Sequence, residues 1–225
     1  MRASLPVLFF GDGLTARIAT VGLNPSKFEY LDRRGGMLAG RTQRFATTTS
    51  LGAPSRAELS DAQADEAIEL MRGYYDDGKP VYGSYFRHLT NFLAGIGASY
   101  HERSATHLDL VQESTDPVWN SLDPNERSHL LERDVPFLVW ELKNLPHLRA
   151  VVCAGKTIGS QLRARVPVDV EETGTTKRIR WWLGTAHIGR RDLPIGGWNY
   201  PLDRPTGLGT AGEVELGKMF ARTLL

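Results

Sequence analysis

The fold is decided by an eight-residue stretch near the N-terminus, Ile18-Ala19-Thr20-Val21-Gly22-Leu23-Asn24-Pro25. Its first four residues form a short apolar run, which is typical of a buried strand. The Asn-Pro step that follows forces the chain to turn. In open α/β folds the ligand binds in the crevice beyond the carboxyl ends of the strands. This position favours Asn24 as a site residue, although an Asn-Pro step also begins ordinary turns.

The length of the chain is enough for one sizeable core and at most two small domains. It has 225 residues, of which 41% are hydrophobic, and one cysteine, Cys153, which cannot form an internal disulfide. No apolar stretch approaches the length of a membrane helix, and Pro6 interrupts the N-terminus too early for a signal peptide. We therefore expect a cytoplasmic monomer without a zinc site. Because the net charge is +1, nucleic-acid affinity must come from local patches.

Strand and helix patterns alternate along the chain. Apolar runs predict four strands, at 17–21, 106–111, 149–154 and roughly 198–202. Helical spacing predicts helices at about 62–75, 85–96 and 125–142, the last broken near Pro136, and further helices at 158–165 and 211–225. This alternation predicts an α/β fold with a parallel sheet and helices on both of its faces.

Two segments extend this plan. Residues 27–80 form a long insertion after the first strand, and residues 168–188 predict a hairpin that turns at Thr173-Gly174-Thr175. Neither has the composition of a linker, so we expect a single domain over residues 1–225. Gly155-Lys156-Thr157 is not a P-loop, because Ala150 stands where that motif requires glycine. Lys156 at a helix N-terminus could still meet a phosphate, or be a solvated lysine.

A second motif, Arg204-Pro205-Thr206-Gly207-Leu208-Gly209, lies between the last predicted strand and the final helix. Together with Gly22-Leu23-Asn24-Pro25 it resembles the uracil-DNA glycosylase superfamily, in particular its mismatch-specific and thymine-glycosylase branch. There the motifs are Gly-Ile-Asn-Pro and Asn-Pro-Ser-Gly-Leu-Ser. The resemblance extends weakly over most of the chain through the order of strands and helices. It implies a three-layer α/β/α sandwich around a central four-stranded parallel sheet, here with an added hairpin and the insertion.

The resemblance implies a monofunctional DNA glycosylase that uses no metal or organic cofactor. Such an enzyme flips a nucleotide out of the stack and hydrolyses its N-glycosidic bond. Asn24 would hold the attacking water, and backbone N–H groups near Gly22 and Leu23 would meet the base. Arg204 replaces the family's His or Asn, and could stabilise the departing base, grip a phosphate or simply pair with Asp203.

The resemblance also implies DNA contacts in the second motif. Thr206, Gly207 and Leu208 would lie against the DNA, and Leu208 matches the wedge that fills the gap left by the flipped nucleotide. Leu208 could equally be an ordinary buried leucine.

Two residues direct the prediction away from plain uracil. Asp109 stands where uracil-excising relatives often have Asn, and an ionised carboxylate only accepts hydrogen bonds. It would repel O4 of uracil and accept from the exocyclic amine of cytosine. Ser26 is small where strict uracil enzymes have a Tyr that blocks substituents at carbon 5. The alternative for Asp109 is a structural role at a strand end.

Aromatic and basic side chains complete the candidate set. Tyr82 and Phe86 could stack on the flipped base, although Phe86 also fits the core. The insertion has clustered arginines that suit phosphate contacts or a merely solvated surface: Arg33, Arg34, Arg41, Arg44 and Arg56.

The combined hypothesis is a DNA glycosylase acting on 5-modified cytosine, hydroxymethylated or glucosylated as in phage DNA, and resembling enzymes of antiviral defence. Three alternatives stay open. They are a uracil or thymine mismatch repair glycosylase, a nucleic-acid-binding module without catalysis, and a hydrolase of free nucleosides.

Overall fold

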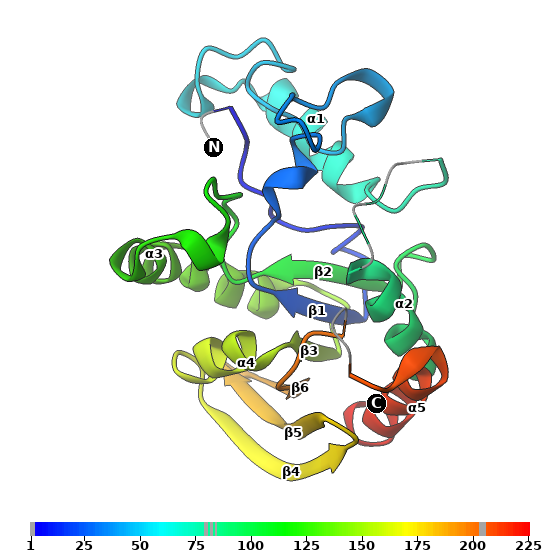
Figure 1. The fold of residues 1–225 in the computed structure, drawn as a ribbon. Coiled ribbons are helices and arrows are strands. Elements are labelled where there is room, and N and C mark those ends of the chain that lie inside the picture. Colours follow the sequence, from blue (N-terminus) through cyan, green and yellow to red (C-terminus); the bar gives the residue numbers. More distant parts are fainter. Residues whose placement is uncertain (1–2, 79–80, 82, 84, 203–205) are drawn as a thin grey trace.

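The computed structural model describes residues 3–78, 81, 83, 85–202 and 206–225. Within these residues the strands form one mixed six-stranded sheet in the order β2-β1-β3-β6-β5-β4 (Figure 1). Parallel pairs join β1 (Ile18–Gly22) to β2 (Ala105–Asp109) and to β3 (Ala150–Ala154), and β3 to β6 (Arg191–Trp198). Antiparallel pairs join β5 (Ile179–Ile188) to β6 and to β4 (Val168–Thr176). The predicted α/β class is confirmed.

Helices cover both faces of the sheet, and β1, β2 and β3 are therefore buried on both sides. Alternate side chains of β1 enter different apolar clusters, Ile18 on one face and Ala19 on the other. The Ile18 cluster contains α2 (Tyr85–Ile96) and α5 (Gly209–Leu224), and the Ala19 cluster contains α3 (Pro124–Asn144) and α4 (Lys156–Arg163). Figure 1 shows these helix pairs on opposite sides of the strands.

The predicted break near Pro136 is wrong, because α3 continues through this proline to Asn144. Proline removes one backbone hydrogen bond and crowds the preceding turn. Here Pro136 is exposed, while Leu131, Val135 and Leu138 beside it are buried in the cluster that α3 shares with the sheet. Burial of that apolar stripe on both sides of the proline keeps the helix in one piece.

Two predictions at the C-terminal strands are also wrong. The expected strand at 198–202 starts where β6 ends, at Trp198. The hairpin reverses at Lys177, which has φ 54°, rather than at 173–175. Gly174 lies within β4 opposite Trp181, and a Cβ there would lie 2.3 Å from Cζ2 of that indole. This glycine therefore makes room for a tryptophan and does not form the turn.

The insertion after β1 lies beside the β2 edge of the sheet, at the top of Figure 1. It contains three short 3-10 helices, η1 (Lys27–Glu29), η2 (Gly40–Thr42) and η3 (Arg56–Glu58), followed by α1 (Asp61–Arg72). Ser60 caps α1, since its Oγ accepts a hydrogen bond from the Gln63 N–H. A further 3-10 turn, η4 (Trp119–Ser121), precedes α3. Several site residues belong to these irregular segments.

Candidate functional site

A cavity of about 480 Å³ opens where β1, β2 and β3 end. Its lining comes from the carboxyl ends of these strands, the start of the insertion, and the N-termini of α2 and α4. The lining residues are Phe10, Gly22, Leu23, Asn24, Pro25, Ser26, Glu29, Tyr85, Phe86, His107, Asp109, Asn120, Ala154, Gly155, Lys156, Thr157, Ile158, Asn199 and Pro201. Seven predicted site residues are among them: Gly22, Leu23, Asn24, Ser26, Phe86, Asp109 and Lys156.

Gly22 opens the cavity to the side chains of the neighbouring strand. It is paired with Asp109 across the parallel ladder between β1 and β2. A Cβ at Gly22 would lie 2.4 Å from Asp109 Oδ1 and 2.7 Å from His107 Nε2. Side chains do not tolerate such approaches, so only glycine leaves space for these two groups at the sheet edge.

Asn24 has its side-chain amide held by three acceptors. Its Nδ2 donates to Pro25 O at 3.2 Å, Glu113 O at 3.3 Å and Thr115 Oγ1 at 3.3 Å. Two backbone carbonyls and a hydroxyl around one atom assign that atom as nitrogen. The amide is therefore held in one orientation with its nitrogen toward the 113–115 segment, which leaves Oδ1 as the acceptor end of the group.

Asp109 belongs to a buried polar chain. Its Oδ1 lies 3.5 Å from His107 Nε2, and His107 Nδ1 lies 2.7 Å from Thr20 Oγ1. Thr20 Oγ1 in turn lies 2.6 Å from the hydroxyl of Tyr100. All four residues are at most 2% exposed. These linked polar side chains orient the Asp109 carboxyl, and Asp109 itself lines the cavity.

Glu29 is a second carboxylic acid in the cavity wall. It ends η1 and is 2% exposed. The Tyr74 hydroxyl donates to both of its carboxyl oxygens at 2.9 Å, and Arg44 Nε lies 3.9 Å from Oε2. Burial raises the pKa of Glu29 to about 8, and Asp109 acts in the same direction, against the effect of Tyr74 and Arg44. Glu29 is therefore mostly protonated at neutral pH.

Aromatic rings form one wall of the cavity. Phe86 is 5% exposed and packs edge-on against His107, with ring centroids 5.1 Å apart. Tyr85 is half-buried and lies 5.7 Å from His107, ring to ring. Tyr82, the other predicted stacking residue, lies outside the described residues. The structure thus presents Tyr85 as an aromatic surface that sequence reasoning assigned only to the helix.

The remaining predicted cavity residues occupy its rim. Lys156 is exposed at the first position of α4, after Gly155 with φ 143°. Ser26 is half-buried and caps η1, since its Oγ accepts from the Phe28 N–H at 3.3 Å. Lys156 thus adds a cation to the lining of the cavity that Glu29 and Asp109 also line.

The arginines of the insertion do not act as one group. Arg33, Arg34 and Arg41 are exposed. Arg44 points inward: its side chain is 16% exposed and donates to Phe28 O at 2.7 Å, beside Glu29. The structure places the half-buried Arg44 side chain next to the Glu29 carboxyl, and its contact with DNA stays a prediction.

The second motif is described only from Thr206 onward, so Arg204 lies outside the described residues. Thr206 is buried and its Oγ1 accepts from the Leu208 N–H at 3.2 Å. Gly207 is exposed, and its carbonyl accepts from Lys177 Nζ. Leu208 is 6% exposed within the cluster of α2 and α5, which matches the buried-leucine alternative.

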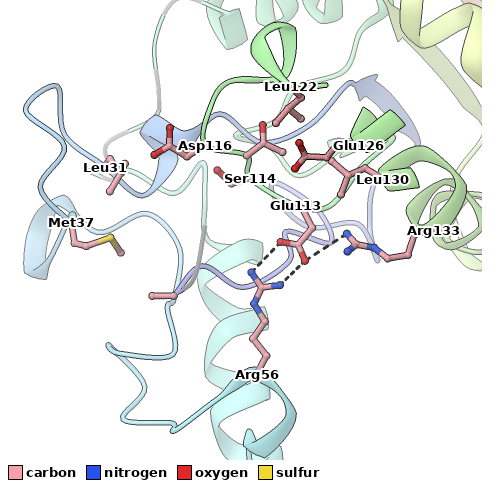
Figure 2. A pocket seen from close by; sticks show the side chains of 12 residues that line it. Leu31, Met37, Arg56, Glu113, Ser114, Asp116, Leu122, Glu126, Leu130 and Arg133 are labelled. Carbon is pink, nitrogen blue, oxygen red and sulfur yellow. Dashed lines mark hydrogen bonds and ion pairs between the residues drawn. The ribbon is translucent and has the colours of Figure 1, made fainter. Parts of the chain in front are cut away.

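A second cavity, of about 750 Å³, lies between the insertion and α3 (Figure 2). Figure 2 shows the Glu113 carboxylate between Arg56 and Arg133, at 2.5 Å and 3.6 Å from their nearest nitrogens. The backbone carbonyl of the same Glu113 accepts from Asn24. Arg56, expected to contact phosphates, thus holds the segment that orients Asn24.

Sequence reasoning missed Glu29, Tyr85, His107, Asn120 and Asn199 as cavity residues. His107 lies inside a predicted strand and pairs with Thr20, and it becomes a cavity residue because its imidazole occupies the space beside Gly22. Glu29 lies in an insertion without a periodic pattern, so no local signal identifies it. Tyr85 could have been found from its place in the sequence, three residues after Tyr82.

No protein-family model, curated protein or solved structure matches this chain. Among the described residues, no cluster of three or more His, Cys, Asp or Glu side chains could hold a metal ion. The described helices include none that is long and apolar enough to cross a membrane.

Proposed function

We propose that this chain is a monofunctional DNA glycosylase that hydrolyses the N-glycosidic bond of a flipped-out base and leaves an abasic site. The main support is that Asn24 and Asp109, from the ends of two neighbouring strands, line the same cavity. Its volume of about 480 Å³ lies within the range of small-molecule sites. The parallel strands β2, β1, β3 and β6 would then correspond to the superfamily's central sheet, with the β4–β5 hairpin as an addition.

The chemistry follows from the fixed orientation of Asn24. With Nδ2 held by Pro25, Glu113 and Thr115, Oδ1 would accept a hydrogen bond from a water beside C1′ of the sugar. The water oxygen bonds to C1′ while the bond from C1′ to the base nitrogen breaks. The bond electrons leave with the base, and the water's proton finally neutralises it. An amide orients water but is a weak base, so we expect slow turnover.

The proposed base is a cytosine enlarged at carbon 5. The Asp109 carboxylate accepts from the exocyclic amine of cytosine and repels O4 of uracil. Ser26 is small, and its hydroxyl is turned to the Phe28 N–H. The exposed Arg33, Arg34 and Arg41 would supply phosphate contacts outside the cavity.

Mass analysis of released bases tests this function. The substrates are DNAs that contain 5-hydroxymethylcytosine, uracil or a thymine mismatch, and the variants are Asn24→Ala and, as a matched control, the exposed Asn144→Ala. We expect the wild type and Asn144→Ala to release the modified cytosine. Asn24→Ala should be at least about 100-fold slower, as for loss of other positioned catalytic amides, and should retain DNA binding.

Each alternative function predicts another result. Release of uracil or thymine instead favours mismatch repair. If the wild type binds DNA but releases no base, this result contradicts the proposed glycosylase activity and favours a nucleic-acid-binding module. Cleavage of free nucleosides, with substrate binding that depends weakly on salt, favours a nucleoside hydrolase.

A further inference from the structure

The insertion places a second acid in the cavity, and the proposed mechanism does not use it. Glu29 lies on η1, and its contacts come from two other parts of the insertion, Arg44 and Tyr74. The insertion surrounds this carboxyl closely enough that Glu29 is 2% exposed, yet it still lines the cavity. A buried acid without a full ionic partner costs stability, so its retention in a cavity wall points to a use.

Glu29 and Asp109 differ in their surroundings. Asp109 faces His107 Nε2 at 3.5 Å. His107 is in turn held in place by the contact between its Nδ1 and Thr20 Oγ1. Among the described residues, Glu29 accepts a hydrogen bond from the Tyr74 hydroxyl at 2.9 Å, and the Arg44 guanidinium lies farther away at 3.9 Å. Burial therefore favours a neutral Glu29, which has an O–H to donate. One cavity thus offers two carboxyl groups in different surroundings, with Glu29 as a donor.

We infer that Glu29 and Asp109 together read the edge of cytosine, with the Glu29 O–H donating to N3 and the Asp109 carboxylate accepting from the exocyclic amine. The inference rests on the proposed glycosylase function and deepens it. Cytosine presents an acceptor and a donor side by side at these positions, whereas uracil presents N3–H and O4 in the reverse order. Uracil would therefore meet two wrong contacts, and buried sites reject such ligands strongly.

Two substrates test the recognition of this hydrogen-bonding edge of the base separately from the substituent at carbon 5. 5-Hydroxymethylcytosine and 5-hydroxymethyluracil have the same substituent at carbon 5 and differ only where Glu29 and Asp109 would bind. We expect the wild type to release the cytosine at least about 30-fold faster, because uracil would leave two buried hydrogen-bonding groups facing mismatched partners. Asp109→Asn should reduce this ratio at least ten-fold, since an amide can donate to O4.

The Glu29 variants test the donor. Glu29→Leu should slow release of 5-hydroxymethylcytosine at least ten-fold, and Glu29→Gln should rescue it relative to Leu because an amide N–H still donates. Wild-type release should fall above about pH 8, where Glu29 loses its proton, and Glu29→Gln should remove this fall. Three groups face the Glu29 carboxyl: the Tyr74 hydroxyl, through its hydrogen bond, and the Arg44 guanidinium lower its pKa, whereas the charge of Asp109 raises it.

Glu141 on α3 gives a matched control. It is also a buried acid whose pKa burial and Asp109 raise, but it does not line the cavity. Glu141→Gln should keep both the base preference and the fall at high pH. Circular dichroism checks that each variant is folded. If Glu29→Leu does not fold, the base preference of Asp109→Asn and the pH profile of Glu29→Gln still test the inference.

The outcomes separate the inference from the function on which it rests. An unchanged base preference in Asp109→Asn, or a wild-type fall at high pH that Glu29→Gln retains, overturns the inference and leaves the glycosylase standing. Release of no base from any DNA by the wild type overturns the proposed function, and the recognition inference with it.

Discussion

Gly22 contributes no functional group, yet the cavity depends on it. Because a Cβ at this position would meet Asp109 Oδ1 and His107 Nε2 well inside contact distance, the site can exist only where β1 has no side chain at its end. The glycine of Gly22-Leu23-Asn24-Pro25 is thus explained by the space that it leaves for Asp109 and His107 of the neighbouring strand.

Gly22→Ala tests this explanation. The added methyl should displace the Asp109 and His107 side chains, lower base release at least ten-fold, and cost about 1–3 kcal/mol of stability through overpacking. Gly36→Ala is the control, since Gly36 is exposed and its added methyl would meet the exposed Asp32 carboxyl at 3.1 Å, and it should leave base release unchanged. Base release and urea unfolding provide the measurements. Wild-type activity and preference in Gly22→Ala would show that Asp109 does not contact the substrate.

At the scale of elements, α3 shows how packing prevails over local propensity. The helix contains Pro136, whose own side chain is exposed, and stays continuous because its other face is buried against the sheet. The cost of the proline remains in the folded state, since the backbone hydrogen bond it removes is not restored.

Pro136→Ala should therefore stabilise the protein by about 2 kcal/mol. The higher helix propensity of alanine contributes about 3 kcal/mol of stability, and the greater entropy of the unfolded chain without proline removes up to about 1 kcal/mol. Urea unfolding measures the change, and His129→Ala, also exposed on α3, should be close to neutral. Base release should be unaffected because Pro136 is not among the residues that line the cavity. A destabilised Pro136→Ala would contradict this account of the helix.

At the scale of the whole molecule, buried acids make stability depend on pH. The pKa of Glu29 is raised from 4.5 to about 8 in the folded state, chiefly by burial. Between these values the unfolded chain releases the proton while the folded chain retains it, so stability falls as pH rises through this window. Below pH 4.5 both states are protonated and Glu29 contributes no penalty.

Glu29→Gln should accordingly gain stability relative to the wild type as pH rises from about 4.5 to 8. The gain in stability is at most roughly 5 kcal/mol, since each unit of difference between the folded and unfolded pKa of Glu29 corresponds to about 1.4 kcal/mol. Thermal unfolding at several pH values measures it, with the exposed Glu66→Gln on α1 as a control that should show no such trend. A difference that stays constant with pH would show that Glu29 is ionised when folded.

Much of the architecture was predictable from local patterns. The first three strands and the helices near 61–72 and 85–96 followed from apolar spacing, because each buries a regular face. The errors occurred where another part of the chain intervened: Gly174 under Trp181, and α3 held together across Pro136. The roles of Arg204 and Tyr82 stay predictions.

The sequence by itself determined the strand that ends in Gly22-Leu23-Asn24-Pro25, and with it the sheet edge where a site belongs. Strand periodicity and a turn signal are local, so eight residues contain them. Only the tertiary structure decided what surrounds Asn24. Parallel pairing placed Asp109 and His107 beside Gly22, and the insertion added Glu29 with Arg44 and Tyr74 behind it. Contacts between residues so distant in the chain leave no local pattern, because they form only when the sheet and the insertion pack together.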